Sequence, residues 1–186
     1  MEEEDLVDSK YQLFPWLYAY KERNFIDMNL NDKLKEEDII LPIQSTTQSE
    51  AIRELLRHLQ NINKLTATNK LFSSISMNEK DLPCAAGRGM AYPHSTSREI
   101  NELTCVLGFS KSGINFNSPD GQLCHIILLT LSSQKDPCEH RKFITRFRTM
   151  INNPNIRSRL LEVTKSKEVI KIIQEWEDED LSGYIN

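Results

Sequence analysis

The chain has 186 residues, of which 39% are hydrophobic and 27% charged, and its formal net charge is −4 at pH 7. This size and composition suit one α/β domain with some residues left over. The acidic balance argues against general nucleic-acid binding, which usually requires a basic surplus. No apolar run approaches the roughly 20 residues that span a bilayer, so we expect no membrane insertion. The acidic start is unlike a secretion signal, and we expect a cytoplasmic location.

Residues 1–26 differ in character from the rest of the chain. Their acidic start is followed by an aromatic patch with a proline inside it, and this proline interrupts any helix there. The aromatic residues are Tyr11, Phe14, Trp16, Tyr18 and Tyr20. Since aromatic clusters more often mark buried contacts than specific ligands, we interpret the stretch as an N-terminal extension that packs on the domain or on a partner chain. A docking segment is the alternative.

The first regular elements are expected from residue 29 onward. Residues 29–34 favour a short helix, and residues 39–43 favour a strand that a proline ends or places at a sheet edge. Thr47 and Glu50 form a capping-box pattern, which opens a helix with apolar residues at helical spacing. A second helix is expected from residue 69 to about residue 77.

Most of the predicted strands follow in the middle of the chain. Small residues after Cys84 lead into a short strand that we expect to end at His94. Residues 104–109 and 114–116 favour two further strands. The connection between them is short enough for a hairpin, which indicates a mixed sheet.

The apolar run 123–131 favours the central strand. Three helices should follow it, from Pro137 to about residue 150, around residues 159–161, and from Ser166. The acidic tail, residues 179–186, is expected to be loose.

Strands placed between helices predict an α/β layered sandwich, in which helices flank a mixed central β-sheet of about five strands. We assign residues 27–178 to this single domain.

We expect free thiols at the four cysteines, which are Cys84, Cys105, Cys124 and Cys138. The combinations Cys124–His125 and Cys138-x-His140 raise the question of a metal site. Zinc ligands usually come as close pairs on loops, whereas Cys124 and His125 are neighbours in a strand-like run and should point to opposite faces. We therefore predict no metal centre.

His94 is the first candidate for chemistry. It follows a proline, whose ring restricts the direction of the backbone that leads to His94. Two glycines upstream, Gly87 and Gly89, allow a tight backbone turn and close contact with another molecule. An imidazole is a good nucleophile near neutral pH. A single histidine is more often a surface or core residue than a catalyst, so the surrounding motif has to decide.

The run from Gly87 to His94, Gly-Arg-Gly-Met-Ala-Tyr-Pro-His, resembles the phosphorylation-site signature of enzyme IIA domains of the mannitol/fructose/nitrogen type in the bacterial sugar phosphotransferase system. Neighbouring elements over roughly residues 29–178 resemble the same family. The resemblance implies that the chain is a phosphocarrier with the mannitol-type enzyme IIA fold. It also implies that His140, at the start of a helix, lies beside the active histidine.

The mechanism implied by the resemblance is phosphoryl transfer. HPr or its nitrogen-branch relative presents a phosphohistidine, His94 accepts the group, and a IIB domain receives it or the phosphorylated state acts as a regulatory signal. The transition state calls for hydrogen-bond donors and positive charge. We expect the phosphoryl-stabilising groups to come from the following residues: Gly87, Arg88, Gly89, Ser95 and Asn78. No cofactor is required.

One position departs from the family pattern. The family usually has an arginine about sixteen residues before the active histidine, and Asn78 stands there in this chain, followed by Glu79. Lys80 or Arg88 could supply positive charge instead, although neither is equivalent to a guanidinium at that place. We favour active phosphotransfer. A regulatory binding module with weak or no transfer is the alternative, and a bare anion-binding scaffold is the third.

Overall fold

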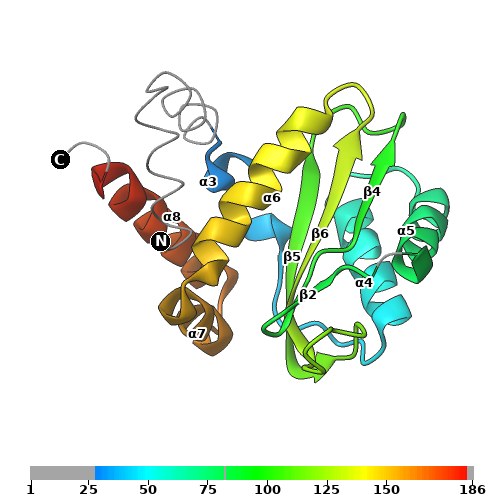
Figure 1. The fold of residues 1–186 in the computed structure, drawn as a ribbon. Helices are drawn as coiled ribbons and strands as arrows, with labels where there is room; N and C mark the ends of the chain where they lie inside the picture. The colour runs from blue at the N-terminus through cyan, green and yellow to red at the C-terminus, as the bar shows by residue number, and fades with distance from the viewer. Residues whose placement is uncertain (1–27, 82, 184–186) are drawn as a thin grey trace, which may run out of the picture.

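The computed structural model describes residues 28–81 and 83–183, and helices flank a sheet in it (Figure 1). The expected N-terminal extension and its aromatic patch lie outside the described residues. In chain order the elements are α3 (Leu30–Lys33), the 3-10 turn η1 (Glu36–Asp38), β1 (Ile39–Ile40), α4 (Gln48–Asn61), α5 (Asn69–Asp81), β2 (Ala85–Gly87), β3 (Met90–Ala91), β4 (His94–Ser97), β5 (Thr104–Ile114), β6 (Cys124–Ser133), α6 (Pro137–Asn152), α7 (Pro154–Glu162) and α8 (Ser166–Gly183).

The sheet is mixed and has six strands in its described part. Its order is β1-β5-β6-β3-β2, and β4 also pairs with β6. β5 runs antiparallel to β6, while β3 and β4 run parallel to it. The predicted α/β layered sandwich is confirmed, and so is the central place of the apolar strand.

β3 and β4 form one broken strand along β6. Met90 is paired with Ile126 and His94 with Thr130, so the register is the same on both sides of the break. The break falls at Pro93, which has no N–H to offer, although its carbonyl oxygen still accepts the Thr130 N–H at 3.0 Å. The expectation that His94 ends a strand was therefore wrong, because His94 begins β4.

Two other expectations about element ends are also corrected. Residues 104–109 and 114–116 do not form a hairpin, because β5 continues through the intervening residues with a register shift between Phe109 and Ile114. The hairpin joins β5 to β6 instead. The tail was expected to be loose from residue 179, but α8 continues to Gly183.

Side-chain caps fix where the helices begin. The Thr47 hydroxyl accepts the Glu50 N–H at the start of α4. The Glu50 carboxylate contacts this hydroxyl rather than the Thr47 N–H, so only half of the expected capping box forms. Asp136 caps α6 and Pro137 follows it at the first helical position. This start places His140 in the first turns of α6.

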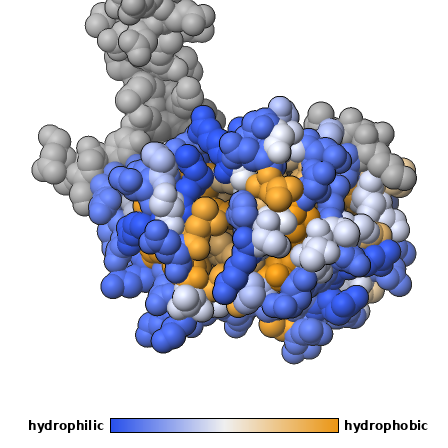
Figure 2. Space-filling view, turned by 90° about the horizontal axis from the view of Figure 1, so that it is seen from below, coloured by the Kyte–Doolittle hydropathy of each residue, from blue (hydrophilic) through white to orange (hydrophobic). Residues whose placement is uncertain are grey.

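The two faces of the sheet carry two separate hydrophobic cores, with α6 and α8 on one side and α4 and α5 on the other (Figure 1). Alternate side chains of β6 supply both cores. Ile126 and Leu128 face α6 and α8, while Ile127 and Leu129 face α4 and α5. None of the described helices is long and apolar enough to cross a bilayer. Figure 2 views the lower end of the sheet, where apolar surface appears in patches between polar residues.

A buried carboxylate joins the start of the domain to its last helix. Glu177 of α8 is 2% exposed, and its two oxygens accept the Leu30 N–H at 2.5 Å and the Asn31 amide at 3.1 Å. Burial raises the pKa of the Glu177 carboxyl above its usual value of 4.5. Nearby, the Arg146 guanidinium pairs with Asp180 and lies over the Trp176 ring.

This arrangement predicts a pH-dependent contribution to stability. Because the folded-state pKa of Glu177 is raised, its contribution is fully present below about pH 4.5 and is lost as the pH rises through the raised pKa. A glutamine at position 177 does not titrate. We therefore expect the unfolding free energy of the wild type, taken relative to Glu177→Gln, to fall as the pH rises across that window. Urea unfolding at several pH values measures it. Parallel pH profiles for the two proteins would contradict the assignment.

Candidate functional site

One ring nitrogen of His94 is engaged by the backbone, and the other is not. The side chain is exposed, and its Nδ1 lies 3.1 Å from the carbonyl oxygen of Tyr92. Because a carbonyl oxygen can only accept, Nδ1 carries the proton in the neutral ring, and the lone pair is on Nε2. Nε2 has no hydrogen-bond partner among the described residues. His94 therefore holds a free nucleophilic nitrogen.

A second imidazole lies against the first. The rings of His94 and His140 are stacked, with centroids 5.7 Å apart and an angle of 28° between their planes. His140 Nε2 lies 2.9 Å from the hydroxyl oxygen of Thr130, the residue that pairs with His94 across the sheet. Burial, with the nearby His94 ring as a second cause, lowers the pKa of His140 below its usual value of 6.5. The expected pairing of these two histidines is present in the structure.

Asn78 reaches the site from the opposite face of the sheet. It lies near the end of α5, and its Nδ2 donates to the backbone carbonyl oxygen of His94 at 3.2 Å. The next residue, Glu79, accepts from Gln48 Nε2 at 2.7 Å and from the Cys84 N–H at 3.4 Å. Asn78 thus lies beside His94, while Glu79 holds the chain between α5 and β2.

Ser95 does not contribute its hydroxyl to the site. Its side chain is 1% exposed and donates to the hydroxyl oxygen of Ser74 on α5 at 2.9 Å. Successive residues of a strand point to opposite faces, so Ser95 faces α5 when His94 faces α6. The expectation that this hydroxyl stabilises a phosphoryl group is corrected.

The segment Gly87–Arg88–Gly89 lies at the far end of the strand. Gly89 and His94 are five residues apart, which at about 3.3 Å per residue is about 16 Å. The Arg88 N–H donates to Asp120 at 2.6 Å, and its guanidinium donates to Asn152 at 3.1 Å. These amides and this cation are therefore not at His94, contrary to the expectation.

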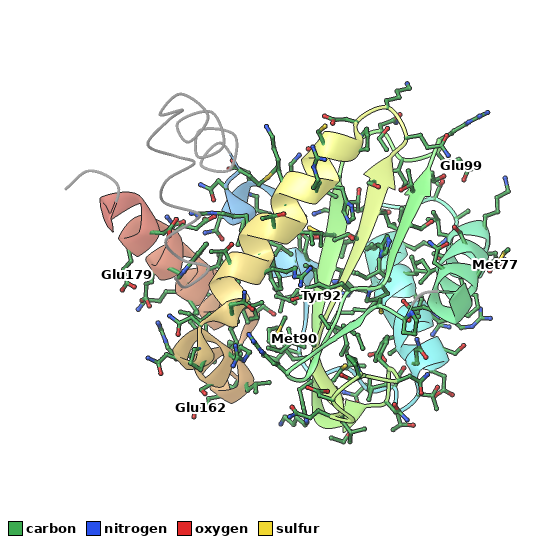
Figure 3. All side chains as sticks on the ribbon, viewed as in Figure 1. Met77, Met90, Tyr92, Glu99, Glu162 and Glu179 are labelled. Carbon is green, nitrogen blue, oxygen red and sulfur yellow. The ribbon has the colours of Figure 1, made fainter. Side chains whose placement is uncertain are left out.

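Arg88 has a positive φ of 57°, which suits the tight turn between β2 and β3 and ties that turn to the β5–β6 hairpin. In Figure 3, Met90 lies near this turn and Tyr92 lies farther along, toward β4. The other expected substitute for the missing arginine, Lys80, has a side chain outside the described residues.

Three hydroxyls near His94 were missed by the sequence analysis. Besides Thr130, the hydroxyls of Thr96 and Ser132 lie 3.0 Å apart, two residues farther along β4 and β6 on the same face. Thr130 is a polar residue inside the apolar run of β6, and this was the sequence signal that could have identified it. Its partner across the sheet could not be known without the register.

The four cysteines are free. Cys124 is fully buried and burial raises the pKa of its thiol to about 11, while the ring of His125 contacts the Ser110 carbonyl oxygen at 2.9 Å. In the part of the chain that the structure describes, no group of three or more His, Cys, Asp or Glu side chains could hold a metal ion.

Comparison with known proteins shows which family the sequence of this chain matches. Residues 32–176 match the family described as phosphoenolpyruvate-dependent sugar phosphotransferase system, EIIA 2. The fructose-specific EIIABC component of Bacillus subtilis is 26% identical over 148 residues, 80% of this chain and 23% of that protein. A nitrogen regulatory protein of Bradyrhizobium diazoefficiens is 22% identical over 148 residues, 78% of this chain and 95% of that protein. The chain spans 23% of the length of the first two curated relatives it matches.

Solved structures have the same fold. Nitrogen regulatory protein IIA-Ntr from Neisseria meningitidis superposes with a TM-score of 0.71 at 21% identity, covering 77% of this chain and 98% of that one. IIA mannitol from Escherichia coli gives 0.65 at 22%, covering 76% and 99%. A complex of Escherichia coli enzyme IIA mannitol with phosphorylated enzyme IIB mannitol gives 0.67 at 20%, covering 77% and 98%.

Proposed function

This chain belongs to the EIIA 2 family of the phosphoenolpyruvate-dependent sugar phosphotransferase system, and from that membership we propose that it carries a phosphoryl group on His94. The observation that supports this most directly is the exposed imidazole with one nitrogen occupied and one free. The Tyr92 carbonyl oxygen holds Nδ1, and Nε2 of this exposed residue has no hydrogen-bond partner among the described residues and keeps its lone pair. A nucleophile for phosphorus needs such a lone pair and open access.

In the proposed reaction, Nε2 of His94 attacks the phosphorus of a phosphohistidine on a carrier protein. The Nε2–P bond forms as the donor's N–P bond breaks, and the electron pair of the broken bond stays on the donor's imidazole. His94 retains its Nδ1 proton, and the Tyr92 carbonyl oxygen offsets part of the resulting positive charge. Negative charge spreads over three equatorial oxygens, so the protein contributes mainly position and hydrogen-bond donors.

Two groups are available as donors beside His94. His140 lies against its ring, and Asn78 has one amide N–H left after donating to the His94 carbonyl oxygen. Both are weaker partners for a phosphoryl dianion than a guanidinium fork, which grips two oxygens at once. We therefore expect transfer to be slower than it would be with an arginine at position 78.

The proposed phosphoryl donor is an HPr-like phosphocarrier protein or its nitrogen-branch relative. The proposed acceptor is a IIB domain or a regulatory target, and the solved complex of enzyme IIA mannitol with phosphorylated enzyme IIB mannitol shows such a pairing for that protein. Such a carrier acts in the cytoplasm and needs neither a metal nor a small cofactor.

A regulatory binding module with weak or no phosphotransfer is the second candidate. The observation that favours it is Asn78, a neutral amide that donates to backbone at the place where the family usually has an arginine. In that case the fold would serve as a protein-binding surface, and phosphorylation would be absent or too slow to matter.

Phosphate labelling separates the two candidates. Incubated with enzyme I, a matching HPr and labelled phosphoenolpyruvate, the wild type should take up acid-labile label, whereas His94→Ala should take up none because its nucleophile is gone. His58→Gln is the matched control, since His58 contacts the Glu37 carbonyl oxygen from α4 and should be dispensable. Arg88→Ala should also be labelled. A folded wild type that takes up no label at any donor concentration would favour the regulatory module.

Restoring the arginine provides a second prediction. Asn78→Arg should raise the rate of phosphoryl uptake about tenfold, which corresponds to ~1.4 kcal/mol of transition-state stabilisation. Asn78→Lys should help less, because an ammonium group is a single point charge. Single-turnover transfer from phosphorylated HPr measures both rates. Equal rates for wild type and Asn78→Arg would contradict the view that position 78 limits transfer.

A further inference from the structure

Thr130 is a buried hydroxyl in the most apolar strand of the molecule. It is fully buried in β6, and its neighbours in sequence, Leu129 and Leu131, are fully buried as well. A buried hydroxyl costs free energy unless it has a hydrogen-bond partner. The partner of Thr130 is Nε2 of His140, at 2.9 Å. Across the sheet Thr130 pairs with His94 on one side and with Cys105 on the other.

We propose that Thr130 is a positioning residue that anchors His140 through Nε2, so that the Nδ1–H of His140 is directed to a phosphoryl group on His94. This inference rests on the proposed function. The anchoring bond is the only hydrogen bond that the His140 ring makes with a described residue. Nδ1 is therefore the ring nitrogen left for a group bound at His94.

The hydroxyl can serve both protonation states of His140. In the tautomer that this proposal assigns to the neutral ring, the Thr130 hydroxyl donates to Nε2 and the ring proton is on Nδ1. When the ring gains a second proton from solvent, Nε2–H donates to the Thr130 oxygen instead, and the hydroxyl hydrogen rotates away. In both states Nδ1 keeps its proton, so His140 remains a donor whether or not a phosphoryl dianion has raised its affinity for a proton.

Other groups around His140 are already engaged. From its own helix, Asp136 accepts the Cys138 and Glu139 N–H groups, and Glu139 pairs with Lys33 at 2.6 Å. Arg141 contacts the Cys138 sulfur, and the Cys105 thiol of β5 donates to the Lys33 carbonyl oxygen at 3.1 Å. From β4 the titratable neighbour is His94. Thr130 is thus the contact through which the His140 ring is fixed to the sheet.

The test compares Thr130→Val, which keeps the shape and removes the hydroxyl, with Thr130→Ser, which keeps the hydroxyl. Nitrogen-15 NMR of the imidazoles reports which nitrogen of His140 carries the proton. We expect the His140 ring in Thr130→Val to lose its preference for a proton on Nδ1. We also expect phosphoryl uptake to slow on the order of tenfold, while the HPr concentration that gives half-maximal uptake stays unchanged. Thr130→Ser should keep both. Thermal unfolding by circular dichroism verifies that each variant is folded.

The two possible failures can be told apart. If Thr130→Val shows wild-type nitrogen-15 shifts for His140, or if Thr130→Ser behaves like Thr130→Val, the positioning role is overturned whatever the transfer rate. If the tautomer of His140 depends on the hydroxyl but the wild type takes up no phosphoryl group, the proposed function fails, while the anchoring of His140 by Thr130 stands.

Discussion

The parallel pairing of β4 with β6 is the constraint on which the candidate site depends. It sets His94 beside Thr130, and the constant register through the Pro93 break keeps His94 on the same face as Met90. The chain then leaves β6, and Asp136 caps α6 so that His140 returns over Thr130. Two histidines that are far apart in sequence are thereby stacked. A shift of one residue in this register would turn His94 to the other face of the sheet.

The site is built from hydrogen-bond donors more than from charge. Burial lowers the pKa of His140, and Asn78 supplies a neutral amide that donates to the His94 carbonyl oxygen. The glycine-rich turn between β2 and β3 has a structural role, because Arg88 binds Asp120 and Asn152 at the other end of the sheet. The chemistry proposed for β4 is thus separate in space from the contacts that hold the β2–β3 turn.

The sequence predicted the parts of the fold that local chemistry determines. Thr47 and Asp136 are capping residues that precede amphipathic runs, and α4 and α6 begin directly after them. The apolar run 123–131 contains most of the central strand, β6. The positions of Gly89 and Ser95 could not be judged from their closeness to His94 in sequence. In an extended strand, five residues span about 16 Å and adjacent side chains point apart. The contact of Thr130 with His140 depends on long-range register, which no local pattern contains.

We propose that Nε2 of His94 is the atom that accepts the phosphoryl group, because the Tyr92 carbonyl oxygen occupies Nδ1. The most direct measurement is nitrogen-15 and phosphorus-31 NMR of the phosphorylated chain with labelled histidine. We expect phosphorus bonded to Nε2 of His94, with Nδ1 still protonated. Phosphorus on Nδ1, or on another residue, would contradict it.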